Sequence, residues 1–466
     1  MEKKEEQEKK KNAWLSYGKR EMKAVSSLNE DYKKFLSASK TERLAAANSV
    51  KEAEKAGFVN LEQVIAEGRE IKPGDKIYAV WMKKTAAFFV IGEEPLTCGM
   101  NILGAHIDSP RLDIKQVPLY EDREFGYLDT HYYGGIKKYQ WVTLPLALYG
   151  VVVKKDGTVV DIAIGDKADD PVLCITDLLP HLGADQMKKG AANVIEGEDL
   201  NILIGSCPLE GEDKEAVKAQ LLKFFKEQYD IEEDDFLSAE IEVVPAGAAR
   251  DLGLDRSMVL GYGHDDRVCA YTSLRAILET RAPKKTSVCL LTDKEEIGSV
   301  GATGAQSFFF ENTVAEILAA MGEESNLAVR RALSRSRMLS SDVSAGFDPI
   351  YPGVNEAKNT AYLGHGLCFN KFTGARGKSG SNDANAEYVA VVRKIMDDNK
   401  VFWQTSELGK VDQGGGGTIA YISAKYGMEV IDAGVAVLSM HAPWEAISKA
   451  DVYEAVKAYK AFLKDA

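Results

Sequence analysis

Hydrophobic residues recur at helical spacing in the first part of the chain, from residue 13 to about residue 68. That periodicity predicts helices across the opening region. Short apolar runs follow at 76–81 and 86–91, and a third run, 101–105, ends at His106. Runs of this length and composition predict strands, and the third has the fully apolar character of a buried strand.

The middle of the chain, residues 113–245, is dominated by short runs of strand-forming residues. Asp156-Gly157 separates two of these runs and is a strong signal for a hairpin turn. One amphipathic helix is expected inside the region. The expected strands are 141–149, 151–153, 159–164 and 240–244, and the expected helix is 215–229. We interpret 113–245 as an inserted β-rich domain.

Beyond residue 261, helices and apolar strands are expected to alternate. The expected helices are 269–279, 314–321, 384–396 and 449–463, and the expected strands are 287–292, 338–340 and 433–439. This alternation predicts an α/β fold with a mixed, largely parallel sheet covered by helices. The strand before His106 is expected in the same sheet. The α/β domain is therefore expected to be discontinuous, built from 13–112 and 246–466, with 1–12 as a charged N-terminal extension.

Composition and charge exclude several classes of protein. The 466 residues include 58 Lys and Arg and 71 Asp and Glu, a formal charge of -13, whereas nucleic-acid-binding proteins normally carry a basic face. No apolar run approaches the roughly 20 residues that span a bilayer, so we expect no membrane partner. The first eleven residues are almost all Glu and Lys, unlike a signal peptide, which favours a cytoplasmic location.

Polar clusters follow the predicted apolar strands at five places. Open α/β sheets bind their ligands at the carboxyl ends of the strands, so these clusters are expected to meet at one edge. Together they would gather several carboxylates at a severe Coulombic cost unless a cation neutralises them. The clusters are 104–110, 263–267, 292–299, 340–344 and 439–443. A bound metal ion is the simplest way to neutralise the carboxylates of these clusters.

The residue types narrow the choice of metal. The six cysteines are scattered without any C-x-x-C pair, so the ligands are expected to be His and carboxylate. Two imidazoles with three or four carboxylates suit a pair of divalent ions about 3.5–4 Å apart, and zinc, cobalt or manganese fits this ligand set. If one of the adjacent Glu295 and Glu296 binds metal, the other can act as general base. Asp108, two residues after His106, can accept the free ring N–H of that histidine.

The residues of these five clusters, in this order and at these intervals, resemble the M18 family of dizinc aminopeptidases, the aspartyl aminopeptidase and aminopeptidase I group. The resemblance spans nearly the whole chain. It rests on Gly104-Ala105-His106-Ile107-Asp108-Ser109-Pro110, His264-Asp265-Asp266-Arg267, Glu295-Glu296-Ile297-Gly298-Ser299, Ser341-Asp342 and Met440-His441. It implies a catalytic domain of the phosphorylase/hydrolase type that hydrolyses the N-terminal peptide bond of peptides.

The resemblance also implies roles for individual residues. His106 and Asp342 would hold one metal ion, Glu296 and His441 the other, and Asp265 would bridge them. Glu295 would be the general base and Asp108 would orient His106. Family members usually have Asn after the bridging Asp, whereas this chain has Asp266, which we expect beside the ligands rather than among them.

Assembly is a further implication of the family likeness. The inserted domain makes dimer contacts in the family, and the dimers assemble into a dodecamer with an internal chamber. Some relatives carry a second His after a Pro-His-Leu segment that reaches a neighbouring site. This chain has Pro180-His181-Leu182 without the second His, and a structural role is expected for His181.

Substrate preference and chemistry leave alternatives open. Lys371 falls near the family lysine that binds an acidic side chain, so Asp or Glu at the substrate N-terminus is one expectation, and a neutral apolar residue is the other. A dimetal deacylase or carboxypeptidase-like hydrolase would use similar ligands, and a binding protein with a relic metal site is the nonenzymatic alternative. A phosphate-binding loop is excluded because Phe372 stands where the motif Gly is required.

Overall fold

The computed structural model describes residues 12–165, 167 and 169–466, so the charged extension predicted for 1–12 lies outside the described residues except for Asn12. The described chain divides into two compact units. The first contains 12–108, 249–440 and 445–466, and the second contains 109–248, apart from 166 and 168, with 441–444. The predicted boundaries at 113 and 245 lie within a few residues of these divisions. The role of the second unit in dimerisation stays a prediction.

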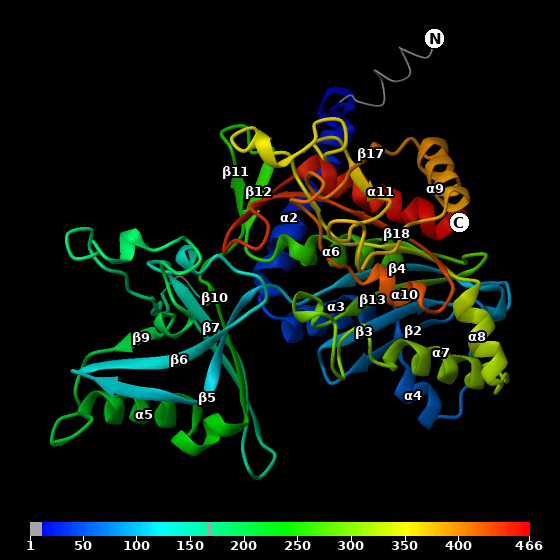
Figure 1. Cartoon of the computed structure of the whole chain (residues 1–466). Coiled ribbons are helices and arrows are strands. Elements are labelled where there is room, and N and C mark those ends of the chain that lie inside the picture. The colour runs from blue at the N-terminus through cyan, green and yellow to red at the C-terminus, as the bar shows by residue number, and fades with distance from the viewer. Residues whose placement is uncertain (1–11, 166, 168) are drawn as a thin grey trace. The chain divides into compact units, whose positions relative to one another are not determined.

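A nine-stranded mixed sheet forms the centre of the first unit (Figure 1). Its middle strands, β13, β4, β14 and β18, are parallel, whereas β3 and β16 pair with their inner neighbours antiparallel. In spatial order the strands are β1 (Val59–Asn60), β2 (Lys76–Trp81), β3 (Thr85–Val90), β13 (Thr286–Thr292), β4 (Met100–His106), β14 (Arg337–Ser340), β18 (Glu429–Gly434), β16 (Leu367–Asn370) and β17 (Trp403–Thr405).

Helices cover both faces of this sheet. Successive side chains of the central strands point to opposite faces, so each face contributes to a separate hydrophobic core. In β4, Leu103 belongs to one core and Ile102 to the other. The first core contains α2 (Lys19–Ala38), α3 (Glu42–Lys55), α6 (His264–Glu279), α9 (Ala386–Asp398) and α11 (Lys449–Asp465), and the second contains α4 (Leu61–Ala66), α7 (Phe309–Ala320), α8 (Asn326–Ser334) and α10 (Ala420–Ala424).

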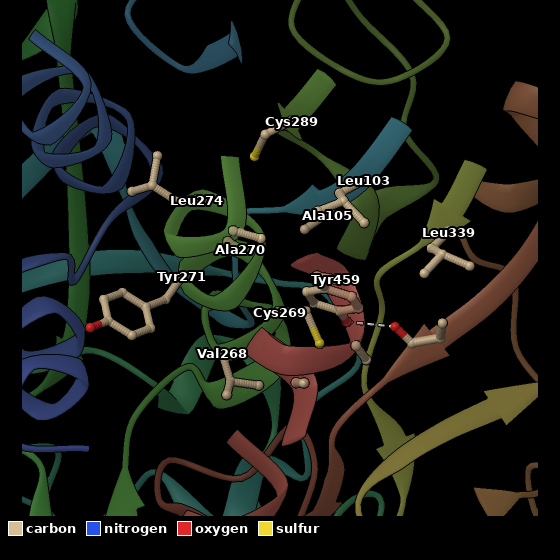
Figure 2. Packing of buried hydrophobic residues seen from close by; sticks show 14 of the residues in the cluster. Leu103, Ala105, Val268, Cys269, Ala270, Tyr271, Leu274, Cys289, Leu339 and Tyr459 are labelled. Atoms are coloured by element: carbon tan, nitrogen blue, oxygen red, sulfur yellow. Dashed lines mark hydrogen bonds between the residues drawn. The ribbon is translucent and has the colours of Figure 1, made fainter. Parts of the chain in front are cut away.

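Figure 2 shows part of the first core, where Cys269 of α6 and Tyr459 of α11 lie near Leu339 of β14. The Tyr459 hydroxyl donates a hydrogen bond of 2.6 Å to the carbonyl oxygen of Ala433 in β18. This bond fixes the closing helix against the sheet while satisfying a buried phenol.

A smaller sheet also belongs to the first unit, with the spatial order β11 (Arg250–Leu252), β12 (Met258–Gly261), β20 (Glu445–Ser448), β19 (Ala436–Leu438) and β15 (Ser344–Ala345). The prediction of one continuous strand at 433–439 is therefore wrong, because this segment is divided between β18 and β19, which belong to two different sheets. The division falls after Gly434, where a side chain would overlap the carbonyl oxygen of Asp342.

The second unit is built on an antiparallel six-stranded sheet with α5 (Ala216–Tyr229). Its strands in spatial order are β8 (Val159–Ile164), β7 (Leu146–Val153), β10 (Ala239–Pro245), β5 (Arg111–Asp122), β6 (Phe125–Tyr133) and β9 (Ile202–Gly205). The hairpin predicted at Asp156-Gly157 joins β7 to β8, with Gly157 at φ +87°. The strand predicted at 141–149 begins only at Leu146, because Trp141 ends a 3-10 turn and Thr143 has φ +60°.

Short 3-10 helices connect these elements in both units. They are η1 (Ala13–Ser16), η2 (Leu96–Cys98), η3 (Lys138–Gln140), η4 (Gln186–Lys188), η5 (Gly197–Asp199), η6 (Glu233–Ser238), η7 (Glu295–Ile297) and η8 (Pro352–Val354). Among the helices the structure describes, none combines the length and apolarity needed to cross a membrane.

Candidate metal centre

The predicted polar clusters of the first unit meet where the central parallel strands end. Thr292 at the end of β13 is in register with His106 at the end of β4, and Ser340 at the end of β14 is in register with Gly104. The chain after Thr292 turns into η7, which carries Glu295 and Glu296. Parallel strands thus bring segments that are far apart in sequence to one edge.

Asp265 reaches the same edge from the first turn of α6. The sequence predicts that this helix begins at Cys269, but it begins at His264, because its first turn is polar yet buried and carries no apolar periodicity. Asp265 and Asp266 depart from helical backbone angles within that turn.

The Nε2 atom of His106 lies at the centre of the carboxylates. It is 3.1 Å from Asp265 Oδ1, 3.9 Å from Glu295 Oε2 and 4.0 Å from Asp342 Oδ1. His106 is only 1% exposed. One imidazole nitrogen therefore faces three acidic side chains from three different segments.

Asp108 contacts the other ring nitrogen of His106. Its Oδ1 is 3.2 Å from His106 Nδ1 and accepts a hydrogen bond of 3.1 Å from the backbone N–H of Glu295. Its Oδ2 accepts one of 3.2 Å from the backbone N–H of Glu296. A single buried carboxylate thus orients the imidazole and fixes the turn that presents both glutamates.

Two groups of side chains in the first unit have ligand atoms within 4.8 Å of one another and could hold a metal ion. One group is His106, Asp265 and Glu296, and the other is His106, Asp266 and Asp342. The Oδ1 atom of Asp266 is buried without a hydrogen-bond partner. Buried carboxylates without a counter-charge are costly, and imidazole with carboxylate oxygens is a donor set that zinc accepts. The residues therefore fit a divalent metal.

The pKa values follow from this crowding. Burial, the charge of Asp266 and those of Glu295 and Asp265 raise the pKa of Asp342 well above its usual range. Burial, together with the charge of Asp265, also raises the pKa of Asp266 well above its usual range. Burial alone would lower the pKa of His106, but its carboxylate partners outweigh burial and raise it. The cluster therefore binds positive charge strongly, whether as protons or as metal.

Two further residues support the centre and were not assigned roles from the sequence. Glu445 Oε2 accepts a hydrogen bond of 3.0 Å from the backbone N–H of Asp265, and Arg267 Nε donates one of 3.2 Å to the carbonyl oxygen of Ile107. The guanidinium of Arg267 is fully buried and lies 5.3 Å from the ring centre of Tyr262. Their only signal in the sequence is that each lies beside a predicted ligand segment.

Lys371 lies elsewhere in the first unit. It follows β16, which runs antiparallel to β18, so the chain after Asn370 runs away from the edge that carries His106. Its ammonium group pairs with Asp383, which also accepts a bond of 2.9 Å from Lys378. Lys371 also lines a cavity of about 270 Å³ with Phe369 and other residues.

His441 and His181 both belong to the second unit. The Nδ1 atom of His441 is 2.9 Å from the carbonyl oxygen of Gly135, and its backbone has φ +64°. His181 is exposed. The metal-binding role predicted for His441 and the structural role predicted for His181 stay predictions.

Comparison with known proteins decides the family. Residues 35–463 match the family model for aminopeptidase I zinc metalloproteases (M18). The chain belongs to the M18 family. This M18 aminopeptidase is 60% identical over 456 residues to a probable M18 family aminopeptidase 1 of Clostridium acetobutylicum, with 98% of each chain covered. The predicted family and the predicted zinc metalloaminopeptidase activity are confirmed.

Solved structures confirm the predicted fold class. A crystal structure of an M18 aminopeptidase from Thermotoga maritima is 44% identical, covers 98% of this chain and 99% of its own, and has a TM-score of 0.93. Aminopeptidase I from Clostridium acetobutylicum has a TM-score of 0.92 at 57% identity, with 97% and 99% covered. A more distant neighbour, at 19% identity and TM-score 0.75, covers 93% of this chain and 95% of its own and is described as the mApe1 dodecamer of S. cerevisiae.

Proposed function

We propose that this M18 aminopeptidase hydrolyses the N-terminal peptide bond of peptides with two divalent metal ions, zinc in the first place and cobalt or manganese as substitutes. His106 and Asp342 would hold one ion, Glu296 and His441 the other, and Asp265 would bridge them. Such a pair of ions lowers the pKa of the attacking water and polarises the peptide carbonyl. The observation that supports this most directly is the set of acidic side chains around His106 Nε2.

Glu295 is the general base in this proposal. Its side chain is 16% exposed, so it is reachable from solvent, and its Oε2 lies 3.9 Å from His106 Nε2. A carboxylate in this position takes a proton from the attacking water and delivers it to the leaving amine, which contributes about 10²–10⁴-fold to the rate. Asp108 holds the backbone of Glu295 in place through its Oδ1.

The test is hydrolysis of aminoacyl chromogenic substrates with Asp, Glu, Leu or Lys, together with an N-acetylated control, after loading with each metal. Glu295→Gln should lose about 10²–10⁴-fold in kcat while keeping its zinc content. The matched control is Glu62→Gln, which changes an exposed side chain on α4 and should retain full activity. Cleavage of the N-acetylated substrate in preference to the free amines would contradict the aminopeptidase assignment and favour a deacylase.

The number of metal ions has its own measurement. Zinc content after dialysis should be two ions per chain in the wild type and one in His441→Ala, because that histidine would serve only one of the ions. A wild type that retains a single ion, or a His441→Ala variant that retains two, would contradict the predicted ligand set.

We also propose a preference for Asp or Glu at the substrate N-terminus, with Lys371 as the residue that binds the acidic side chain. Because Lys371 pairs with Asp383, the substrate carboxylate would have to replace that partner. Lys371→Met should then raise KM for Asp substrates and leave Leu substrates unchanged. A wild-type preference for Leu would retain the mechanism and remove Lys371 from it.

Assembly into dimers and then a dodecamer is the last part of the proposal, with the second unit making the dimer contacts. Light scattering should then give the mass of twelve chains. A monomer or an isolated dimer would contradict the enclosed chamber and would leave the chemistry of the metal centre unaffected.

A further inference from the structure

A buried polar cluster lies on the face of the central sheet that packs against the second core. It includes Ser340, which ends β14 two residues before Asp342. Asp432 in β18 is in register with Ser340 in β14 on one side and with Asn370 in β16 on the other. Met338 and Val430, two residues earlier on their strands, belong to the second core. Because alternate residues share a face, Ser340 and Asp432 point toward that core as well.

The carboxylate of Asp432 lies beside two hydroxyl groups, those of Thr418 and Ser340, and both act on it as hydrogen-bond donors. Neither of these contacts has the geometry of a full hydrogen bond, and both carboxylate oxygens of Asp432, the Ser340 hydroxyl and the Asn370 amide nitrogen are buried. Asp432 is 2% exposed. Burial raises the pKa of Asp432 to about 6, even though the hydroxyls of Thr418 and Ser340 act in the opposite direction. Buried carboxylates whose hydrogen bonds are this incomplete are rare.

Thr418 is a further residue whose side chain interacts with Asp432. Its Oγ1 accepts a hydrogen bond of 3.2 Å from the backbone N–H of Ala420 at the start of α10, so its own hydroxyl proton remains to be donated. The donors of Thr418, Ser340 and Asn370 thus surround the acceptors of Asp432. The two hydroxyls therefore join one carboxylate to two segments that are far apart in sequence.

The cluster connects the segment of a predicted metal ligand with a glycine-rich segment. Ser340 ends the strand that leads to Asp342, and Thr418 ends the four-glycine segment 414–417. That segment is already fixed at its start, because a side chain at Gly415 would come within 2.4 Å of the carbonyl oxygen of Gly374, and Gly415 has φ +123°. Thr418 is the anchor at the other end.

We propose that Asp432 is a positioning residue of the peptidase reaction, whose carboxylate ties Thr418 at the end of the glycine segment to Ser340 at the base of the Asp342 segment. This inference rests on the proposed function, because it takes Asp342 to be a metal ligand. Asp432 itself touches no reacting atom. It fixes the end of the glycine segment relative to the strand end that leads to Asp342.

The experiment compares Thr418→Val, which removes the hydroxyl at nearly constant shape, with Thr418→Ser, which keeps it, and with Asp432→Asn. Thr418→Val and Asp432→Asn should each lower kcat by about 10-fold to 100-fold, with zinc content unchanged, whereas Thr418→Ser should restore most of the activity. Thr313→Val is the matched control, because the hydroxyl of Thr313 donates only to Phe309 within α7.

A double-mutant cycle separates positioning from general destabilisation. If Asp432 and Thr418 act as one unit, the double variant should be no slower than the slower single variant. Independent multiplication of the two losses, or a Thr418→Val variant with wild-type kcat, would overturn the inference. If Asp432→Asn does not fold, a cycle of Thr418→Val with Ser340→Ala makes the same test. A wild type without aminopeptidase activity would instead overturn the proposed function.

Discussion

Asp108 illustrates how much of the centre depends on one side chain. Its two oxygens satisfy the His106 ring and two backbone N–H groups, so no proton or amide can replace the carboxylate without loss. With Asn at this position, the side-chain NH₂ group would face one of these three N–H donors, so one of the three hydrogen bonds would be lost. The arrangement explains why a carboxylate, rather than any polar residue, stands two positions after His106.

Asp108→Asn should therefore lower kcat/KM or zinc affinity by about 10-fold to 100-fold, as is usual for residues that orient metal ligands. The measurement is steady-state kinetics together with zinc titration. Asp156→Asn makes the same chemical change in the hairpin of the second unit and should have no effect, because Asn-Gly suits that turn equally well. Equal behaviour of the two variants would contradict the role of Asp108.

Prediction from sequence succeeded at this scale where residue type and position both carried information. His106, Asp265, Glu295 and Asp342 were expected at one sheet edge because each follows an apolar run or precedes a helix, and the structure brings them together. Arg267 and Glu445 act through backbone atoms. A contact to a backbone atom leaves no pattern of residue types, so sequence reasoning gave these two no role.

Strands and helices were predicted well where the period of apolar residues was regular. The central strands β4, β13 and β14 lie where they were expected because burial on both faces makes them continuously apolar. The start of α6 and the division between β18 and β19 were not predicted. Both depend on tertiary packing at Asp265 and Gly434 that residue periodicity does not encode.

Gly434→Ala tests one of these close approaches. A methyl group at this position would lie 1.8 Å from the carbonyl oxygen of Asp342, so the segment that carries Asp342 must shift. We expect loss of zinc binding and of activity, measured by metal content and kinetics. Gly353→Ala, where the new methyl group meets no atom within 4 Å, should behave as wild type. A fully active Gly434→Ala variant would show that Asp342 tolerates displacement.

The start of α11 predicts a pH effect on stability. Asp451 is fully buried, accepts bonds of 2.7 Å from the backbone N–H groups of Gly364 and Gly366, and has Glu454, Tyr17 and Cys368 as its titratable neighbours. Burial, with Glu454 adding to it, raises its pKa to about 8. The native state then holds a proton that the unfolded chain loses above about pH 4.

The wild type should consequently lose stability as the pH rises from about 4 to about 8, by up to roughly 1.4 kcal/mol per pH unit from this group. Asp451→Asn cannot ionise and should lack this contribution. Denaturant unfolding of both proteins across this pH range measures the difference. A constant difference between wild type and variant would mean that Asp451 is ionised throughout.

At the scale of the whole molecule, the discontinuous organisation was expected from the position of the β-rich region. Its exact extent was not, because the short segment 441–444 belongs to the second unit although it follows the rest of that unit by almost 200 residues in sequence. Segments this short carry no periodicity of their own. The allocation of such connecting segments depends on packing that the sequence pattern does not encode.

Metal removal should destabilise the first unit. Without a cation, the carboxylates around His106 repel one another, which is why burial and mutual charge raise the pKa values of Asp266 and Asp342. Chelation should lower Tm, and zinc should restore it, since a ligand present at 100 times its Kd stabilises by about 2.7 kcal/mol. His106→Ala should show a much smaller response, and an equal response would place the stabilising metal elsewhere.

The interleaving of the two units has a consequence for synthesis. The central strand β4 needs β13 and β14, which emerge from the ribosome roughly 180 and 230 residues later, and the second unit receives its last segment only at 441–444. Multidomain chains commonly fold from the N-terminus as each domain is completed. Here neither unit is complete until almost the whole chain has been translated, so nascent and truncated chains carry the catalytic side chains without the sheet edge that assembles them.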